Sequence, residues 1–597
     1  MKNFFTTFFA CLAAIVASSI VLSVISLLMF AGMIAALSVS PETAVVQSNT
    51  VLKIDLNDPV RDEPVQNPLS GFNPYTMKMT THLALLDVLN AIEAAADDDR
   101  IKGIYLNLNP VLETGMANLE EIRAALETFK ESGKFVVSYA DFYTQSTYYL
   151  SSVADEVYLN PEGEIMWQGM SSQIMFFKGA LDKLGVEAEV VRCGEFKSAV
   201  EPFISDRMSP ANRHQMDVLL GTIWGSVVGD IARSREIDSA LLQRYASDLA
   251  VAGAESAAEY RMIDGIKYGD EVMDRLEELS GEDDPGFIGL ADYMGAGFGH
   301  QGHGRKKLSK NRIAVVYAEG DIIDGESMPG SIGGQTLADK LADVREDDGV
   351  KAVVLRVNSP GGSALASEVI WREMTLLQQE KPVVVSMGNY AASGGYYISC
   401  PADVILADRT TLTGSIGVFG LMFNAEKGLK DKLGITVDVA KTNPSADMLT
   451  LFRPQTPAEK AYLQNRVNSV YSTFVGHVAH GRNLPEEEVL RIGGGRVWSG
   501  ISADSIGLID GFGGLREAIL LAADRAGVGE DFRVVAPSEE TNPLAMFLKG
   551  LLSGEMEGVS SGLPQEAAHA AEEYRETMKV LNRQGVQALM PYRIRIQ

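Results

Sequence analysis

A single serine within a run of small residues is the first candidate for a nucleophile in this sequence. Ser393 stands in the segment AASGGYY (391–397), shortly after the β-branched run at 383–385. A strand that ends in a small-residue turn can present a serine hydroxyl at the start of a helix, and the glycines allow a substrate backbone to come close. The alternative interpretation is structural, with Ser393 acting only as the N-cap of that helix. This segment alone supports both interpretations.

A serine nucleophile needs a partner that takes its proton. Lys197 lies in the segment GEFKSAVEPF (194–203), where the apolar neighbours Phe196 and Phe203 would bury its amine and lower its pKa. Glu195 and Glu201 would oppose this role by keeping the lysine charged. A surface lysine without chemistry is the structural alternative.

The histidines offer no comparable arrangement. The sequence contains seven, and none is close to Ser393 in the chain. A Ser-His-Asp site can form from distant residues, but no motif surrounds the histidines considered for it, namely His82, His214, His477 and His480.

Backbone donors for an oxyanion are expected at two glycines. Gly362 lies in NSPGGS (358–363) after a predicted strand, and Gly394 follows Ser393 directly. Their N–H groups could stabilise the negative charge that develops during acyl transfer. Ser415, in TGSIG (413–417), has a short hydroxyl that could orient the lysine amine. The structural alternative at both places is an ordinary turn.

The overall composition limits the classes of function. The chain has 597 residues, which is too long for one hydrophobic core. Its formal net charge of −27 argues against nucleic acid and anionic membrane surfaces as partners. Its three cysteines, Cys11, Cys193 and Cys400, form no disulfide framework and no metal-binding spacing, so no metal site is predicted.

The amino-terminal segment predicts a membrane anchor. Residues 11–39 are nearly continuously apolar, and this stretch exceeds the roughly 20 residues that cross a bilayer. It is also longer than the roughly 7–15 apolar residues of a cleaved signal peptide, although small residues at 35–38 leave cleavage open. Lys2 before it and Glu42 after it place the amino terminus in the cytoplasm and the rest of the chain outside it.

Comparison of the chain with itself reveals two copies of one α/β domain. The segment at 97–109 resembles 346–358, and the segment from Lys134 resembles KPVVVSMGNYAASGGYYISCPAD from Lys381. Within each copy, apolar strands alternate with helical patterns, which predicts parallel sheets with crossover helices. We expect an anchor at 1–45, a first repeat at 46–280, a linker at 281–312, a second repeat at 313–530 and a tail at 531–597.

The two copies differ where chemistry would occur. The second copy keeps the glycine pair of NSPGGS and the turn around Ser393, whereas the first reads TQST (144–147) at the turn. The first copy instead carries Lys197, and Pro444 stands near that position in the second. Because each copy has lost what the other retains, we expect one composite site that both repeats build.

These motifs together resemble the signal peptide peptidase A (protease IV) group of serine peptidase family S49, in its long tandem-domain form. NSPGGS, the serine of ASGGYY, TGSIG, the tandem repeats and the amino-terminal anchor carry the resemblance, which extends to about residue 530. The segment ALMPYRIRI (588–596) also resembles the end of that family.

The resemblance implies a fold, a mechanism and a setting. It implies two ClpP/crotonase-like domains and a Ser-Lys dyad without metal or ATP, in which Ser393 is the nucleophile and Lys197 the base. Ser415 then assists the lysine, and Gly362 and Gly394 form the oxyanion site. It further implies a homotetramer anchored in the bacterial inner membrane that degrades signal peptides and other hydrophobic peptides on the extracytoplasmic side.

Two other classes of function remain open at this stage. A crotonase-type acyl-CoA enzyme also uses glycine N–H donors, but it would lack a membrane anchor. A membrane scaffold with a relic site would need neither the intact NSPGGS motif nor the serine-glycine turn.

Overall fold

The computed structural model describes residues 45–64, 72–73, 78–79, 82–108, 110, 114–281, 285–298, 309–537 and 587–590. Residues 1–44, which hold most of the predicted anchor, lie outside these ranges. Within the described ranges, no helix combines the length and the apolar character that crossing a bilayer requires.

The first repeat is built on a parallel sheet of six strands in the order β10-β8-β7-β6-β1-β11. Its strands are β1 (Thr50–Ile54), β6 (Ile101–Leu106), β7 (Phe135–Tyr143), β8 (Glu156–Ile165), β10 (Gly265–Ile266) and β11 (Gly286–Gly289). Two two-stranded ladders accompany it, formed by β2 (Val60–Arg61) with β5 (Leu83–Ala84) and by β3 (Phe72–Asn73) with β4 (Lys78–Met79). The central strands are buried and rich in β-branched and aromatic residues, as expected for parallel strands covered on both faces.

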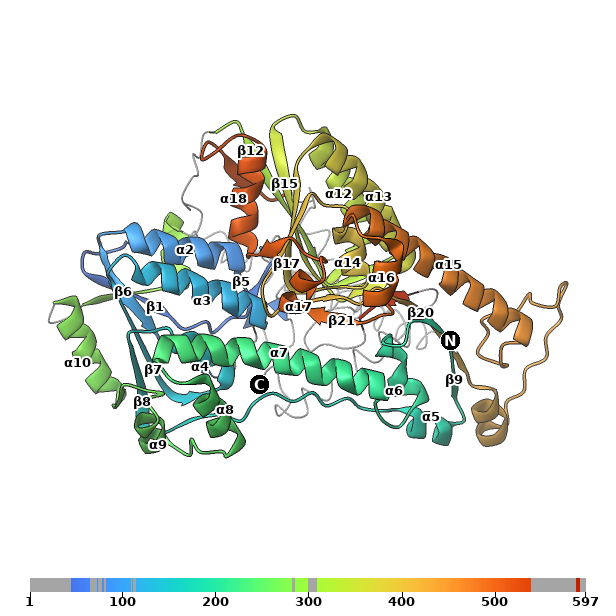
Figure 1. Ribbon diagram of the computed structural model, residues 1–597, viewed down its shortest axis with the longest axis horizontal. Coiled ribbons are helices and arrows are strands. Elements are labelled where there is room, and N and C mark those ends of the chain that lie inside the picture. The colour runs from blue at the N-terminus through green and yellow to red at the C-terminus, as the bar shows by residue number, and fades with distance from the viewer. Residues whose placement is uncertain are drawn as a thin grey trace, which may run out of the picture. The chain divides into compact units, whose positions relative to one another are not determined.

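Helices connect and cover these strands. They are α2 (Leu85–Asp97), α3 (Met116–Lys130), α4 (Gln145–Ser151), α5 (Lys178–Leu184), α6 (Glu201–Ile204), α7 (Pro210–Arg235), α8 (Ser239–Ser247), α9 (Ala254–Glu259), α10 (Gly269–Ser280) and α11 (Leu290–Tyr293). The longest, α7, starts with a proline after Ser209, whose hydroxyl accepts from the Asn212 N–H as an N-cap. This helix begins close to α6 and extends toward α4 beside the first sheet (Figure 1).

The second repeat forms an eight-stranded sheet with the path β21-β19-β17-β15-β12-β23; β18 branches from β17, and β22 pairs with β18. Its strands are β12 (Arg312–Glu319), β15 (Val350–Ser359), β17 (Val383–Ala392), β18 (Val404–Ala407), β19 (Leu412–Gly414), β21 (Val497–Ser499), β22 (Gly511–Phe512) and β23 (Arg533–Val535). Its helices are α12 (Gly334–Glu346), α13 (Ala364–Glu380), α14 (Gly394–Ser399), α15 (Pro457–Gly481), α16 (Glu486–Ile492), α17 (Gly500–Ser505) and α18 (Leu515–Arg525). The prediction of two α/β repeats is therefore confirmed. The assignment to a ClpP/crotonase-like fold stays a prediction.

The two sheets have matching topology. The order β10-β8-β7-β6-β1-β11 in the first repeat corresponds to β22-β18-β17-β15-β12-β23 in the second. Both outermost strands lie beyond the repeats expected from the sequence, because β11 falls in the predicted linker and β23 in the predicted tail. The glycine-rich composition of 281–312 suggested a linker, but the short segment GFIG still pairs with β1 along its backbone.

A third sheet joins the two repeats, with the order β14-β13-β16-β24-β20-β9. Its strands are β9 (Glu187–Cys193), β13 (Asp321–Ile323), β14 (Ser331–Gly333), β16 (Gly361–Ser363), β20 (Val418–Asn424) and β24 (Gln587–Leu589). Only β9 comes from the first repeat, and it pairs antiparallel with β20 from Val418 opposite Cys193 to Asn424 opposite Glu187. The segment that carries Lys197 follows β9, so this ladder brings it to the second repeat.

A buried charge cluster also links the repeats. Arg356 on β15 donates to Asp62 through Nε at 2.8 Å and pairs with Glu121 on α3 at 2.7 Å. It also donates to the Ser386 hydroxyl on β17 at 2.7 Å. The side chains of Arg356, Asp62 and Glu121 are at most 4% exposed, so each depends on the others for charge compensation.

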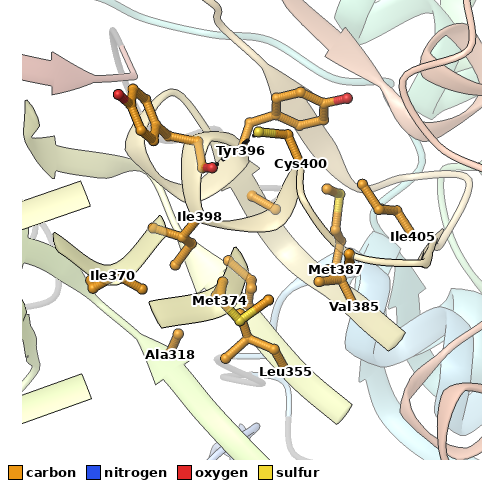
Figure 2. Packing of buried hydrophobic residues seen from close by; sticks show 14 of the residues in the cluster. Ala318, Leu355, Ile370, Met374, Val385, Met387, Tyr396, Ile398, Cys400 and Ile405 are labelled. Carbon is orange, nitrogen blue, oxygen red and sulfur yellow. Dashed lines mark hydrogen bonds between the residues drawn. The ribbon is translucent and has the colours of Figure 1, made fainter. Parts of the chain in front are cut away.

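The core of the second repeat holds α14 against the sheet. Tyr396, Ile398 and Cys400, from α14 and its end, pack with Met374 of α13 and Val385 of β17 in one buried cluster (Figure 2). The Tyr396 hydroxyl donates to the Leu508 carbonyl at 2.8 Å. The start of α14, where Ser393 lies, is therefore held by packing on several sides.

Candidate active site

Ser393 occupies a strained turn between β17 and α14. Its backbone has φ 56° and ψ −113°, a region that residues other than glycine rarely adopt. Its N–H donates to the Gly414 carbonyl at 2.7 Å, and its carbonyl accepts from the Tyr397 N–H at 2.8 Å. The side chain makes no capping hydrogen bond, so the N-cap interpretation of this serine is wrong. Strain of this kind persists where the surroundings impose it, which is common at functional sites.

The corresponding turn of the first repeat has an ordinary conformation. Thr144 precedes α4 with φ −72° and ψ 168°, and its hydroxyl accepts from the Thr147 N–H as an N-cap. The Gln145 side chain binds the backbone of Gly169. Its Oε1 accepts from the Gly169 N–H at 2.8 Å, and its Nε2 donates to the Gly169 carbonyl at 3.0 Å. The same strand-to-helix junction thus forms without strain, and the conformation of Ser393 is not required by the topology.

Lys197 lies next to Ser393 within the same chain. Its Nζ is 2.7 Å from Ser393 Oγ, 3.0 Å from Ser415 Oγ and 3.2 Å from the Ser415 carbonyl oxygen. The lysine is positioned by β9 and by the 3-10 turn Ser198–Val200 that follows it. The structure therefore brings together three of the predicted site residues, from both repeats.

Burial determines the electrostatics of the lysine. Lys197, Ser393 and Ser415 are each 0% exposed. Burial of the amine lowers the pKa of Lys197 well below the ordinary value of a lysine, because the charged form loses its hydration. A neutral amine has a lone pair with which it can accept the hydroxyl proton of Ser393.

The neighbouring glutamates do not hold the lysine in its charged form. Glu195 is exposed to solvent. Glu201 faces the start of α7, where its carboxylate accepts from the Ser209 N–H at 3.2 Å and the Asn212 Nδ2 at 2.8 Å. In the part of the chain that the structure describes, Lys197 forms no ion pair.

Ser415 is itself held in an unusual conformation. It has φ 52°, and its N–H donates to the Arg496 carbonyl at 2.7 Å. Its hydroxyl contacts the Gly495 carbonyl oxygen at 3.4 Å in addition to Lys197. The arrangement fixes an oxygen-lined environment around the amine, which directs the amine toward Ser393.

The run Gly493–Gly495 is a part of the site that the sequence analysis missed. Gly495 has φ 80°, and a methyl group placed on it would lie 2.7 Å from Lys197 Cβ. Gly494 accepts from the Phe196 N–H at 2.9 Å. Only glycine allows this backbone to pack directly on the lysine segment. Three consecutive glycines were a visible signal, but nothing in the sequence indicated which segment they would contact.

The two predicted oxyanion glycines lie on turns that pack against each other. A methyl group on Gly361, which has φ 100°, would lie 2.6 Å from the Gly394 nitrogen, and one on Gly362 would lie 1.9 Å from the Ile322 carbonyl oxygen. Larger residues are excluded at these positions. The role of the Gly362 and Gly394 N–H groups stays a prediction.

Histidines contribute nothing to this arrangement in the described part of the chain. His477 contacts Glu368 at 3.0 Å and stacks on Trp371 with 3.5 Å between the ring centroids. His82 contacts the Glu63 carbonyl at 2.9 Å. His214 and His480 are exposed.

Comparison with known proteins identifies several relatives. Peptidase family S49 matches this chain twice, over residues 128–282 and 375–529. The chain is 36% identical over 493 residues to "Protease 4" of Salmonella typhi, which covers 80% of this chain and 78% of that protein. It is 36% identical over 518 residues to "Protease 4" of Haemophilus influenzae, with 84% and 83% covered. It is 33% identical over 522 residues to "Serine protease SPPA, chloroplastic" of Arabidopsis thaliana, with 85% and 74% covered.

Proposed function

The chain belongs to peptidase family S49 and is a serine peptidase of the tandem-repeat type, and we propose that Ser393 is its nucleophile and Lys197 its general base. The observation that carries this proposal is the 2.7 Å contact between Lys197 Nζ and Ser393 Oγ in a buried site. An amine whose pKa is lowered by burial can be neutral at the working pH and can take the serine proton.

The proposed reaction uses the groups around this pair. Ser393 Oγ attacks the peptide carbonyl while its proton moves to Lys197 Nζ. The lysine then protonates the leaving amine, and water hydrolyses the acyl-enzyme in a second cycle of the same proton transfers. Ser415 keeps the amine oriented, and the N–H groups of Gly362 and Gly394 stabilise the oxyanion.

The substrates and setting form the broader part of the proposal. We propose that the substrates are hydrophobic peptides, including cleaved signal peptides. We further propose that the protein is a homotetramer, which the apolar segment at 11–39 anchors in the bacterial inner membrane. Both repeats then lie on the extracytoplasmic side. The length of that segment and the resemblance to the family support this. Protease protection in spheroplasts tests the orientation, and light scattering of the detergent-extracted protein tests the tetramer.

Three matched variants test the proposed pair. Ser393→Ala and Lys197→Ala should each abolish hydrolysis of an apolar peptide, and Ser393→Ala should abolish labelling by a fluorophosphonate probe. Ser146→Ala is the matched control, because Ser146 lies at the corresponding turn of the first repeat and is also buried. Near-normal turnover by either of the first two variants would refute the assignment.

A further inference from the structure

The strand that leads to Ser393 is interrupted by a bulge shortly before its end. Between the pair Val357–Met387 and the pair Ser359–Ala391, three residues of β17 stand opposite one residue of β15. Before this bulge β17 pairs with β18, and beyond it β17 pairs with β19. A bulge changes the direction of the residues that follow it, and bulges are common next to active sites. The bulge therefore determines where β17 places Ser393.

Side chains and backbone groups of the first repeat hold this bulge. The Oδ1 of Asn389 accepts from the Ala117 N–H at 3.0 Å, and its Nδ2 donates to the Asn118 Oδ1 at 3.3 Å. A methyl group on Gly388 would lie 3.0 Å from Asp62 Oδ2, so the backbone of the bulge also lies close to that carboxylate. The first repeat thus contacts two of the three residues that form the bulge.

The third residue of the bulge, Tyr390, is connected to the first repeat through Asn358. The Tyr390 N–H donates to Asn358 Oδ1 at 3.2 Å, and Asn358 Nδ2 donates to Asp62 Oδ2 at 2.7 Å. Asp62 is 0% exposed. Asn358 is also the first residue of NSPGGS, which carries the predicted oxyanion donor Gly362. The same support therefore reaches both the serine turn and the glycine turn.

Asn389 also completes the start of helix α3 in the first repeat. Gly115 is the N-cap of this helix and provides no side-chain hydrogen bond, and Ala117 is its second residue. The amide oxygen of Asn389 accepts from one of the N–H groups that a capping side chain usually satisfies. A methyl group on Gly115 would lie 2.2 Å from Asn389 Oδ1, so the glycine leaves room for the asparagine.

We propose that Asn389 is a positioning residue for Ser393 and acts by anchoring the bulge of β17 to the amino terminus of α3. This inference rests on the proposed function. The first repeat then supplies the base, Lys197, and also fixes the strand that presents the nucleophile. Without the anchor the bulge relaxes, and the 2.7 Å contact between Lys197 Nζ and Ser393 Oγ is no longer held. Proton transfer becomes slower, whereas the binding of a peptide changes little.

Substitutions of Asn389 test the anchor. Asn389→Leu has a similar size but neither accepts nor donates a hydrogen bond. It should lower kcat for peptide hydrolysis and the rate of fluorophosphonate labelling of Ser393 by about 10–100-fold, with little change in KM. The pH dependence of kcat/KM should stay as in the wild type, because Lys197 remains buried. Asn389→Asp keeps an acceptor for the Ala117 N–H and should restore most of kcat.

A matched control separates positioning from a general loss of stability. Asp238 caps α8 of the same repeat, where its carboxylate accepts from the Ala240 N–H at 2.7 Å. Asp238→Ala should lower Tm and leave kcat unchanged. If Asn389→Leu also lowers Tm but keeps the wild-type kcat per folded protein, Asn389 has only a structural role and the proposal is wrong. Failure of Asn389→Asp to regain kcat would overturn it as well.

A double-mutant cycle tests the same contact from the other repeat. In the wild-type background the methyl group of Gly115→Ala displaces the Asn389 side chain, so kcat should fall. In the Asn389→Ala background that space is free, and adding Gly115→Ala should change kcat no further. Equal losses in both backgrounds would contradict the proposal.

The proposed function can fail independently of this inference. Wild-type kcat in Asn389→Leu, together with hydrolysis that Ser393→Ala abolishes, would remove the positioning role and leave the proposed function standing. Hydrolysis that persists equally in Ser393→Ala would refute the proposed function itself.

Discussion

Replacing Lys197 by methionine should remove activity and at the same time stabilise the fold at neutral pH. Methionine has a similar length and no charge, so it suits a site where the side chain is 0% exposed. Loss of the general base should lower kcat/KM by at least about 10³-fold, because a base and its nucleophile act as one unit. Stabilisation is expected because burial lowers the pKa of Lys197, which means that enclosing the charged amine opposes folding.

The pH dependence of this effect has a defined sign. In the unfolded chain the lysine stays protonated up to about pH 10.4, whereas in the folded chain the lowered pKa of Lys197 releases the proton at lower pH. At pH values between the folded-state and the unfolded-state pKa of Lys197, the lysine binds more protons in the unfolded chain. Its contribution to wild-type stability therefore rises by about 1.4 kcal/mol per pH unit. The gain in the free energy of unfolding of Lys197→Met over the wild type is therefore greatest below the folded-state pKa of Lys197. This gain decreases as the pH approaches about 10.4.

Thermal unfolding between pH 6 and pH 10 measures this directly. The difference in Tm between Lys197→Met and wild type should narrow as pH rises, and wild-type kcat/KM should reach its plateau well below the ordinary pKa of lysine. Lys183→Met is the matched control for the loss of a lysine at the surface, since Lys183 is exposed. A constant Tm difference for Lys197→Met, or wild-type activity that still rises tenfold per pH unit near pH 10, would refute the reasoning.

Three further substitutions test the supports of the site. Ser415→Ala removes a hydroxyl 3.0 Å from Lys197 Nζ and should lower kcat by about 10–100-fold with little change in KM, measured by peptide hydrolysis; an unchanged kcat would contradict its role. Gly495→Ala places a methyl group 2.7 Å from Lys197 Cβ at φ 80° and should reduce both activity and Tm. Arg356→Met leaves two buried carboxylates without their cation and should destabilise the chain by about 3–5 kcal/mol in urea titrations; an unchanged midpoint would show that the cluster is not coupled to folding.

Most of the fold could be predicted because its signals are local. Apolar β-branched runs such as 383–385 and helical patterns such as 367–379 correspond to β17 and α13 in the structure. The repeat added long-range information, since two copies of one pattern imply two copies of one sheet. The serine-glycine turn and the lysine motif were visible as residue types, and their loss in opposite copies indicated that they would meet.

The parts that could not be predicted depend on pairing between distant segments. Strand β24 has three residues and no alternating pattern, so only its partners β16 and β20 define it. Strand β11 was hidden in a glycine-rich stretch for the same reason. Arg356 gave a partial signal, because it interrupts the apolar run AVVLRV at 352–357, but its carboxylate partners lie on segments far away in the chain.

The division of the site between two repeats follows from what a buried amine requires. A lysine with a lowered pKa opposes folding, so the segment that carries it must be held by contacts that offset this penalty. The seven paired positions of β9 and β20 supply backbone hydrogen bonds, and the ion cluster around Arg356 ties the first repeat to the second at another place. Because Lys197 follows β9 of the first repeat, whereas Ser393 and Ser415 belong to the second repeat, the site is complete only when both repeats are folded and joined.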